Sequence, residues 1–358
     1  MSLSIRSVVV ARTAIKPAHI SGLGLGLCMI LAMATPPAGV HRADAARIAL
    51  PTHAVQAAAA DRGPAWSKFG PTGSLGVLDM TQIMQALGNS QRLVGAFEDM
   101  GYRLDRLRDG VGTVPRLYLA SLPSDLPQVE SPEVRKAVFI KSILPIILRV
   151  NEEVLERRAK LEALSRKAAL GREFNASEKE WLSTTAALYD LKTPDLPELL
   201  RRVDVVPPSL ALAQAALESG WGTSRFAQKG NALFGQKIFI DSSAAMPSYD
   251  RDGNEAFRMR SFDDVFSSVR SYVHNLNSHP AYADFRKLRA DMRRKTTADR
   301  NDFGPAGSEA LAKTLVSYSE RGADYITDVR NLMQVNDLRV FDRARLASEA
   351  VTNFGPGA

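Results

Sequence analysis

A strongly apolar helical stretch with one acidic side chain at its end constrains this sequence more than any other feature. Residues 207–222 read Pro-Pro-Ser-Leu-Ala-Leu-Ala-Gln-Ala-Ala-Leu-Glu-Ser-Gly-Trp-Gly. Two prolines suit the first turn of a helix, strong helix formers follow, and Gly220 provides a C-terminal stop. Because this helix is apolar on almost every side, we expect it to be buried at the centre of a mainly α-helical fold.

The single ionisable residue of this helix, Glu218, lies in its last turn. The partial negative charge of a helix C-terminus disfavours a carboxylate there, and no Lys or Arg lies three or four positions away. Burial acts in the same direction, so we expect a carboxyl that stays protonated to unusually high pH. Such a group is what a glycosidase needs as its general acid. The alternative is a structural Glu that points into water at a fraying helix end.

The first 45 residues have the pattern of a secretory signal peptide. Basic residues precede an apolar run over 20–34, which is short for a membrane span, and small residues follow it. We therefore expect export and cleavage within 1–45, with no stable membrane insertion afterwards; the alternative is an uncleaved anchor. Cys28 lies in this leader, so the mature chain would have no thiol and no thiolate metal ligand.

The remaining chain predicts three segments around the catalytic region. Residues 46–110 are weakly patterned, with clusters of Ala, Gly and Pro, and predict a linker or loosely ordered arm. Residues 111–200 predict a helical N-terminal region that packs on the catalytic domain, with a helix that Pro145 should kink or split. Residues 201–340 form the predicted catalytic domain, and residues 341–358 a tail.

A small β-hairpin interrupts the helical pattern of the catalytic region. Residues 233–240 and 256–260 have strand-like composition, and Asp252-Gly253 between them is a turn signal. The sequence therefore predicts a mainly α domain with a small β-hairpin lobe.

Several motifs carry a resemblance to a known family. Ala-Leu-Glu-Ser-Gly-Trp-Gly-Thr-Ser-Arg-Phe at 216–226 and Gly-Asn-Ala-Leu-Phe-Gly-Gln-Lys at 230–237 resemble the glucosaminidase domain of bacterial cell-wall hydrolases. These enzymes form glycoside hydrolase family 73, which includes the hydrolase domain of a flagellar rod-cap protein. The lead-in at 201–212 and Tyr-Ser-Glu-Arg-Gly at 318–322 are similar to those of Bax-type periplasmic proteins. The resemblance covers about residues 111–335.

This resemblance implies a lysozyme-like fold in which a helical lobe and a β-lobe flank a sugar groove. It implies a periplasmic hydrolase that cleaves the β-1,4 bond after N-acetylglucosamine in peptidoglycan, without metal or cofactor. Glu218 would protonate the leaving oxygen. The second carboxylate that such enzymes usually need falls near the hairpin turn, where Tyr249 departs from the family pattern and the adjacent Asp250 is our candidate. In the alternative, the substrate's own acetamido group assists, with Tyr318 as its orienting group.

The other candidate site residues come from the same motifs. Asn231, Phe234 and Gly235 match the family's groove floor, although Phe234 is equally compatible with the core. We predict that substrate contacts Gln214, Trp221, Asn231, Phe234, Gly235 and Tyr325, while Tyr325 also fits a packed helix-end aromatic.

Two other functions stay open, and two kinds of site are not expected. A lytic transglycosylase needs one acidic Glu, and a non-catalytic wall-binding module would keep the same fold.

The basic run over 286–300 lacks interleaved aromatics, which favours a solvated helix over nucleic-acid binding. His274 and His279 have the wrong spacing for a metal pair on one helical face. Loss of the leader, with four basic residues and one acid, would lower the formal charge from +7 to +4, which still suits an anionic wall polymer.

Overall fold

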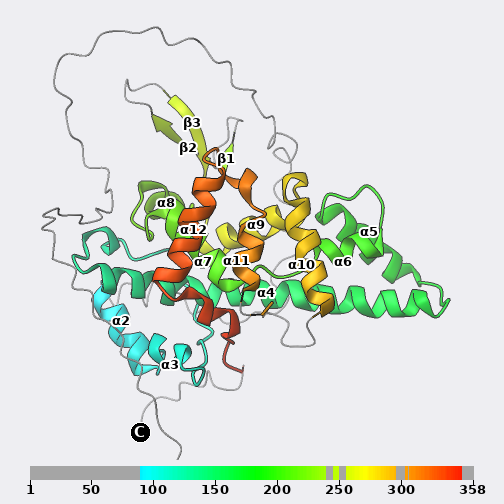
Figure 1. The fold of residues 1–358 in the computed structure, drawn as a ribbon, viewed down its shortest axis with the longest axis horizontal. Helices are drawn as coiled ribbons and strands as arrows, with labels where there is room; N and C mark the ends of the chain where they lie inside the picture. Colours follow the sequence, from blue (N-terminus) through cyan, green and yellow to red (C-terminus); the bar gives the residue numbers. More distant parts are fainter. Residues whose placement is uncertain (1–88, 239–244, 250–254, 296–302, 305, 349–358) are drawn as a thin grey trace, which may run out of the picture. The chain divides into compact units, whose positions relative to one another are not determined.

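The computed structural model describes residues 89–238, 245–249, 255–295, 303–304 and 306–348, all of which belong to one compact unit. As predicted, this part of the chain is mainly α-helical with one small antiparallel sheet (Figure 1). None of its helices is both long and apolar enough to cross a membrane. The α-helices are α2 (Ser90–Asp99), α3 (Leu104–Arg108), α4 (Pro132–Ala169), α5 (Ala176–Leu188), α6 (Leu196–Arg202), α7 (Pro208–Ser219), α8 (Arg225–Gly230), α9 (Val265–Ser278), α10 (Ala283–Lys295), α11 (Gly307–Ala312) and α12 (Ala323–Val335). The 3-10 helices are η2 (Leu126–Gln128), η3 (Pro280–Tyr282), η4 (Val316–Tyr318) and η5 (Leu338–Arg343).

Helix α7 is the buried helix that the sequence predicted. Pro208 occupies its first turn, and Gly220 ends it in the left-handed conformation with φ 58°. All side chains from Pro208 to Ala216 are buried. The helix packs against α4, α12 and η5, so elements from both ends of the described chain hold it in place (Figure 1).

Helix α4 is one continuous element of 38 residues, and it does not split at Pro145. Pro145 removes one backbone hydrogen bond, but the side chains from Val138 to Leu148 are all buried. The packing of these side chains outweighs the local loss. Ser131 caps the helix by accepting a hydrogen bond from the Val134 N–H.

Two segments that the sequence assigned to an arm and a tail are partly packed into the core. Helices α2 and α3 lie within the predicted arm over 46–110, and Leu93 and Phe97 are fully buried against α4. At the other end, Val114 forms a parallel bridge with Leu346, within the predicted tail over 341–358. Both segments carry apolar side chains that become buried in the same hydrophobic core. This burial explains both differences.

The sheet has three strands, whereas the sequence predicted two. Its strands β1 (Lys237–Ile238), β2 (Ala245–Tyr249) and β3 (Glu255–Arg260) are ordered β1-β3-β2 and pair antiparallel. Strand β1 begins at Lys237, later than predicted, because Leu233 and Phe234 are buried in the helical core instead. The predicted Asp252-Gly253 turn lies outside the described residues.

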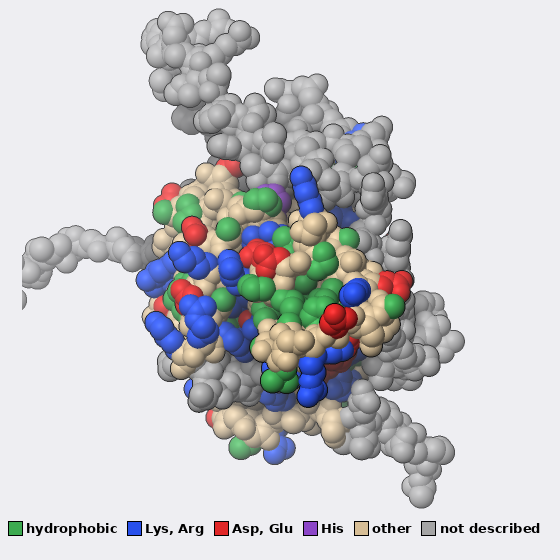
Figure 2. Space-filling view, turned by 90° about the vertical axis from the view of Figure 1, so that its right-hand side faces the viewer, with side chains coloured by type: hydrophobic (Ala, Val, Ile, Leu, Met, Phe, Trp, Pro, Cys, Tyr) green, Lys and Arg blue, Asp and Glu red, His purple; other side chains and the backbone are tan. Residues whose placement is uncertain are grey.

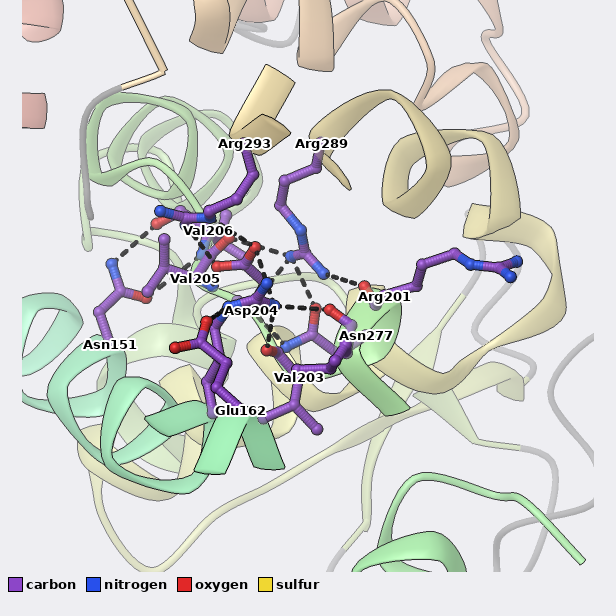
Figure 3. Close-up of polar contacts among 12 residues, drawn as sticks. Asn151, Glu162, Arg201, Val203, Asp204, Val205, Val206, Asn277, Arg289 and Arg293 are labelled. Carbon is purple, nitrogen blue, oxygen red and sulfur yellow. Dashed lines mark hydrogen bonds and ion pairs between the residues drawn. The ribbon is translucent and has the colours of Figure 1, made fainter. Parts of the chain in front are cut away.

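A buried network of polar side chains fixes the segment 203–206 that leads into α7 (Figure 3). Arg289 of α10 is fully buried and donates to the backbone oxygens of Asp204 (3.1 Å) and Val205 (3.0 Å). Arg293 forms a two-pronged ion pair with the Asp204 carboxylate, and Asn151 of α4 donates to the Val206 carbonyl over 2.9 Å. Side chains of α4 and α10 therefore both hold the segment at which α7 begins.

Part of the basic run over 286–300 belongs to this network. Arg286, Arg289 and Arg293 form internal hydrogen bonds or ion pairs instead of a solvated basic face. Burial lowers the pKa of both Arg286 and Arg289 to about 10, so both remain charged at neutral pH. On the face shown in Figure 2, Lys and Arg side chains gather towards one side, with Asp and Glu among them.

Candidate active site

The Glu218 carboxyl lies at the end of α7, directly beneath the loop that leads into β1. Glu218 is half-buried, and the backbone of Gly235 passes so close that an added Cβ would lie 2.5 Å from Glu218 Oε2. Gly235 also has φ 64°, a conformation that a residue with a side chain rarely adopts. A glycine is therefore required here for two reasons, the positive φ of its backbone and the space that the Glu218 carboxyl occupies.

Burial raises the pKa of Glu218, as the sequence predicted. A hydrogen bond from Tyr325 and the positive charges of Arg321 and Lys237 oppose this effect. Glu218 forms no ion pair with any of the described residues. The two cations pair elsewhere, Lys237 with Glu320 and Arg321 with Asp328.

A buried chain of hydrogen bonds leads to this carboxyl from α9. The Tyr272 hydroxyl donates to Gln214 Oε1 over 2.7 Å, and Gln214 Nε2 donates to the Tyr325 hydroxyl over 2.9 Å. Tyr325 in turn lies beside Glu218, and its hydroxyl lowers the pKa of that carboxyl. Gln214 was predicted to contact substrate, but its side chain is fully buried and both ends of its amide are engaged. Gln214 therefore lies in the protein interior, next to Tyr325.

Stacked aromatic rings surround this hydrogen-bond chain. The Phe234 ring stacks on Tyr272 with centroids 3.9 Å apart, and the Tyr318 ring stacks on Tyr325 at 5.6 Å. The Tyr318 hydroxyl donates to the Phe234 carbonyl over 3.0 Å, which ties η4 to the loop above Glu218. The structure thus brings Tyr318, Phe234 and Tyr325 together with Glu218. Burial raises the pKa of Tyr282, beside this group, to about 12.

Two other predicted substrate contacts have structural neighbours instead. The Trp221 ring packs edge-to-face on Phe139 at 5.7 Å, and Lys136 Nζ lies 5.3 Å from the centre of the Trp221 ring, so Trp221 faces α4. Asn231 ends α8 and donates to the backbone oxygens of Phe262 (3.1 Å) and Asp263 (3.2 Å). A substrate role for Trp221 and Asn231 stays a prediction.

The second candidate carboxylate, Asp250, lies outside the described residues, so its place relative to Glu218 stays a prediction. The described residues include no group of three or more His, Cys, Asp or Glu side chains that could hold a metal ion. His274, one of the two histidines considered above, has its ring Nε2 2.6 Å from the Leu188 carbonyl, and burial lowers its pKa.

The sequence did not identify Tyr272, Lys237 or Arg321 as members of the site. Tyr272 was visible only as one apolar position in the helical pattern of α9, which predicts burial but not a partner. Lys237 and Arg321 lie within the recognised motifs at 230–237 and 318–322, and this was the available signal.

Comparison with known proteins places this site in a family. The glucosaminidase family model, described as mannosyl-glycoprotein endo-beta-N-acetylglucosaminidase, matches residues 193–338. Protein bax of Escherichia coli (strain K12) is 34% identical over 212 residues, which cover 58% of this chain and 71% of that relative. The chain belongs to the Bax-type family of glucosaminidase-domain proteins. No solved structure matches it. Glu218, Gly235 and the tyrosines around them all lie within the matched glucosaminidase region.

Proposed function

We propose that this protein is an exported hydrolase that cleaves the β-1,4 bond after N-acetylglucosamine in peptidoglycan. The observation that carries the proposal is the Glu218 carboxyl, which is half-buried, forms no ion pair with the described residues and has a raised pKa. The glucosaminidase family gives the class of bond, because its members are glycosidases. A carboxyl whose pKa is raised by burial suits the protonation of a glycosidic oxygen.

In the proposed reaction, the Glu218 proton passes to the leaving oxygen as the glycosidic C–O bond breaks. The carboxylate that results is stabilised by the Tyr325 hydroxyl and by the positive charges of Arg321 and Lys237. Water then adds to the sugar carbon, and the proton that it loses passes to Asp250 or, where the acetamido group assists, back to the Glu218 carboxylate. Either Asp250 activates this water or the substrate's acetamido group assists its attack, with Tyr318 as orienting group.

A lytic transglycosylase is the second candidate function. It needs one acidic Glu, and one carboxyl of raised pKa is what the described part of the site contains. The two reactions differ in product mass, because hydrolysis adds water and transglycosylation leaves an anhydro-muramyl end. Mass spectrometry of digested peptidoglycan distinguishes them, and an absence of any turnover would favour a non-catalytic wall-binding module.

Export to the periplasm is part of the proposal and rests on the leader pattern in residues 1–45. N-terminal sequencing of the protein recovered from the periplasm tests it. Recovery of an intact Met1 terminus in the membrane fraction would contradict it.

Substitution of Glu218 tests the proposed general acid. Glu218→Gln keeps the shape of the side chain but cannot donate the proton, so turnover of peptidoglycan should fall about 10²–10⁴-fold. Glu98→Gln, at an exposed position on α2, is the matched control and should keep wild-type turnover. Near wild-type activity of Glu218→Gln would reject the assignment.

The pH dependence of both activity and stability follows from the raised pKa of Glu218. Activity requires the protonated acid, so it should fall as the pH rises through this pKa, at higher pH than for an ordinary Glu. The stabilising contribution of the protonated carboxyl is lost over the same range, because the folded chain binds this proton more tightly than the unfolded chain. Glu218→Gln should therefore be at least as stable as the wild type at neutral pH, as thermal unfolding can verify.

A further inference from the structure

The hydrogen-bond chain behind Glu218 has a defined direction. Tyr272 and Gln214 are both fully buried. Because Gln214 donates its N–H to the Tyr325 oxygen, the Tyr325 hydroxyl proton is left free to point towards Glu218. The Tyr272 hydroxyl supports this orientation by donating to the amide oxygen of Gln214.

The opposite orientation of the amide would reverse this direction. If the Gln214 oxygen faced Tyr325, the Tyr325 hydroxyl would donate to the amide and could then only accept from Glu218. The carboxyl proton would be directed into the protein interior and would be unable to reach a leaving group. With the Gln214 N–H donated to the Tyr325 oxygen, a carboxyl oxygen of Glu218 that accepts the Tyr325 proton would be the carbonyl oxygen of the protonated acid. The other oxygen then carries the proton that the reaction consumes.

We propose that Tyr272 and Gln214 are positioning residues for the general acid, since together they hold Tyr325 as a hydrogen-bond donor to Glu218. This inference rests on the proposed function and deepens it. Neither residue touches substrate: both act through Tyr325, and Tyr272 acts only through the amide of Gln214.

The other groups around Glu218 do not depend on the hydrogen bonds between Tyr272, Gln214 and Tyr325. Lys237 of β1 pairs with Glu320, Arg321 pairs with Asp328, and the Tyr318 hydroxyl donates to the Phe234 carbonyl. The Tyr282 ring of η3 lies 6.0 Å from the Tyr318 ring, measured between centroids. A change confined to the Tyr272 hydroxyl leaves all of these charges and hydroxyls in place. Its effect on Glu218 therefore measures the contribution of the hydrogen bonds that run through Gln214 and Tyr325.

Tyr272→Phe is the decisive variant, because it removes one hydroxyl and keeps the ring that stacks on Phe234. The amide of Gln214 is then free to turn its oxygen towards Tyr325, and Glu218 loses its donor. We expect kcat on peptidoglycan to fall about tenfold with little change in KM, from the size of a hydrogen bond to a charged group. The loss of a donor to the carboxylate should raise the pKa of Glu218 and move the high-pH limb of activity to higher pH.

A carboxyl titration followed by ¹³C NMR measures the same effect without any turnover. In the full-length protein, the Glu218 carboxyl signal should titrate at higher pH in Tyr272→Phe than in the wild type. Tyr189→Phe is the matched control, because Tyr189 is also a buried tyrosine but contacts His274 and lies outside the site. It should leave both the titration and kcat unchanged.

A double-mutant cycle decides whether Tyr272 acts through Tyr325. In a Tyr325→Phe background, adding Tyr272→Phe should produce no further change in the Glu218 titration or in kcat. An unchanged titration in Tyr272→Phe alone, or an equal displacement in both backgrounds, would overturn the proposal. If the wild type shows no activity on peptidoglycan, the proposed function fails, and the NMR cycle still decides the direction of the hydrogen-bond chain.

Discussion

At the scale of single residues, the Glu218 carboxyl depends on the absence of two groups beside it, a side chain at position 235 and a described ion-pair partner. Gly235 lacks the side chain that would collide with Glu218 Oε2, and no described residue forms an ion pair with that carboxyl. Burial then dominates its electrostatics and raises its pKa. The motif residue Gly235 was predicted to line a groove floor; the structure adds that it sets the space available to the acid.

Gly235→Ala should therefore impair activity far more than stability. The positive φ costs about 1–2 kcal/mol for Ala. The added Cβ would also displace the Glu218 carboxyl. A misplacement of about 1 Å can lower turnover on the order of a hundredfold. Gly171→Ala is the control, because its φ of 67° imposes the same strain but nothing lies within 4 Å of the added Cβ. Equal turnover in the two variants, measured on peptidoglycan, would show that the contact with Glu218 does not matter.

At the scale of elements, α7 depends on the segment that precedes it. The Asp204 carboxylate is almost fully buried and lies within ion-pair distance of Arg293 and, at 3.4 Å, of Arg158. Arg289 satisfies the carbonyls of the same segment. Helices α4 and α10, which are distant in the sequence, are thus joined at the start of the helix that carries Glu218.

Asp204→Asn should destabilise the protein by about 3–5 kcal/mol, because it leaves buried arginine charge uncompensated. Asp291→Asn removes the exposed ion pair with Arg294 on α10 and should cost less than about 1 kcal/mol. Urea unfolding of the two variants measures the difference. Similar losses in both would mean that the buried network contributes little to the fold.

At the scale of the whole molecule, the glucosaminidase region does not contain all of its own core. The matched residues 193–338 include α7 but exclude α4 and most of η5, against which α7 packs. The left-handed Gly222, just after Glu218, also packs tightly: an added Cβ would meet Leu122 at 2.5 Å and Phe139 at 3.0 Å. The N-terminal helices and the segment after 338 are therefore structural parts of the candidate active site.

A chain limited to 193–338 should accordingly fail to fold cooperatively, whereas 89–348 should fold. The shorter chain would expose the apolar face of α7 that α4 and η5 cover, and such burial contributes roughly 25 cal/mol for each Å². Thermal unfolding followed by circular dichroism compares the two. A single cooperative transition in the shorter chain would contradict this dependence.

The sequence alone determined the features that depend on local pattern. The apolar run and its prolines predicted the buried helix α7, Gly220 predicted its end, and the absence of a neighbouring cation predicted the direction of the Glu218 pKa. These predictions succeed because helix propensity, capping and short-range charge act over a few residues. The family motifs added the class of chemistry.

Only the tertiary structure decided which distant groups reach Glu218. Tyr272, Gln214 and Tyr325 lie on three different helices, and their spacing in the chain says nothing about the hydrogen bonds between them. The same holds for Pro145, whose local effect is outweighed by packing, and for α2, whose short pattern gave no sign of the core it joins. The physical reason is that the partners of a buried polar group depend on how helices far apart in the sequence pack, which a local pattern does not encode.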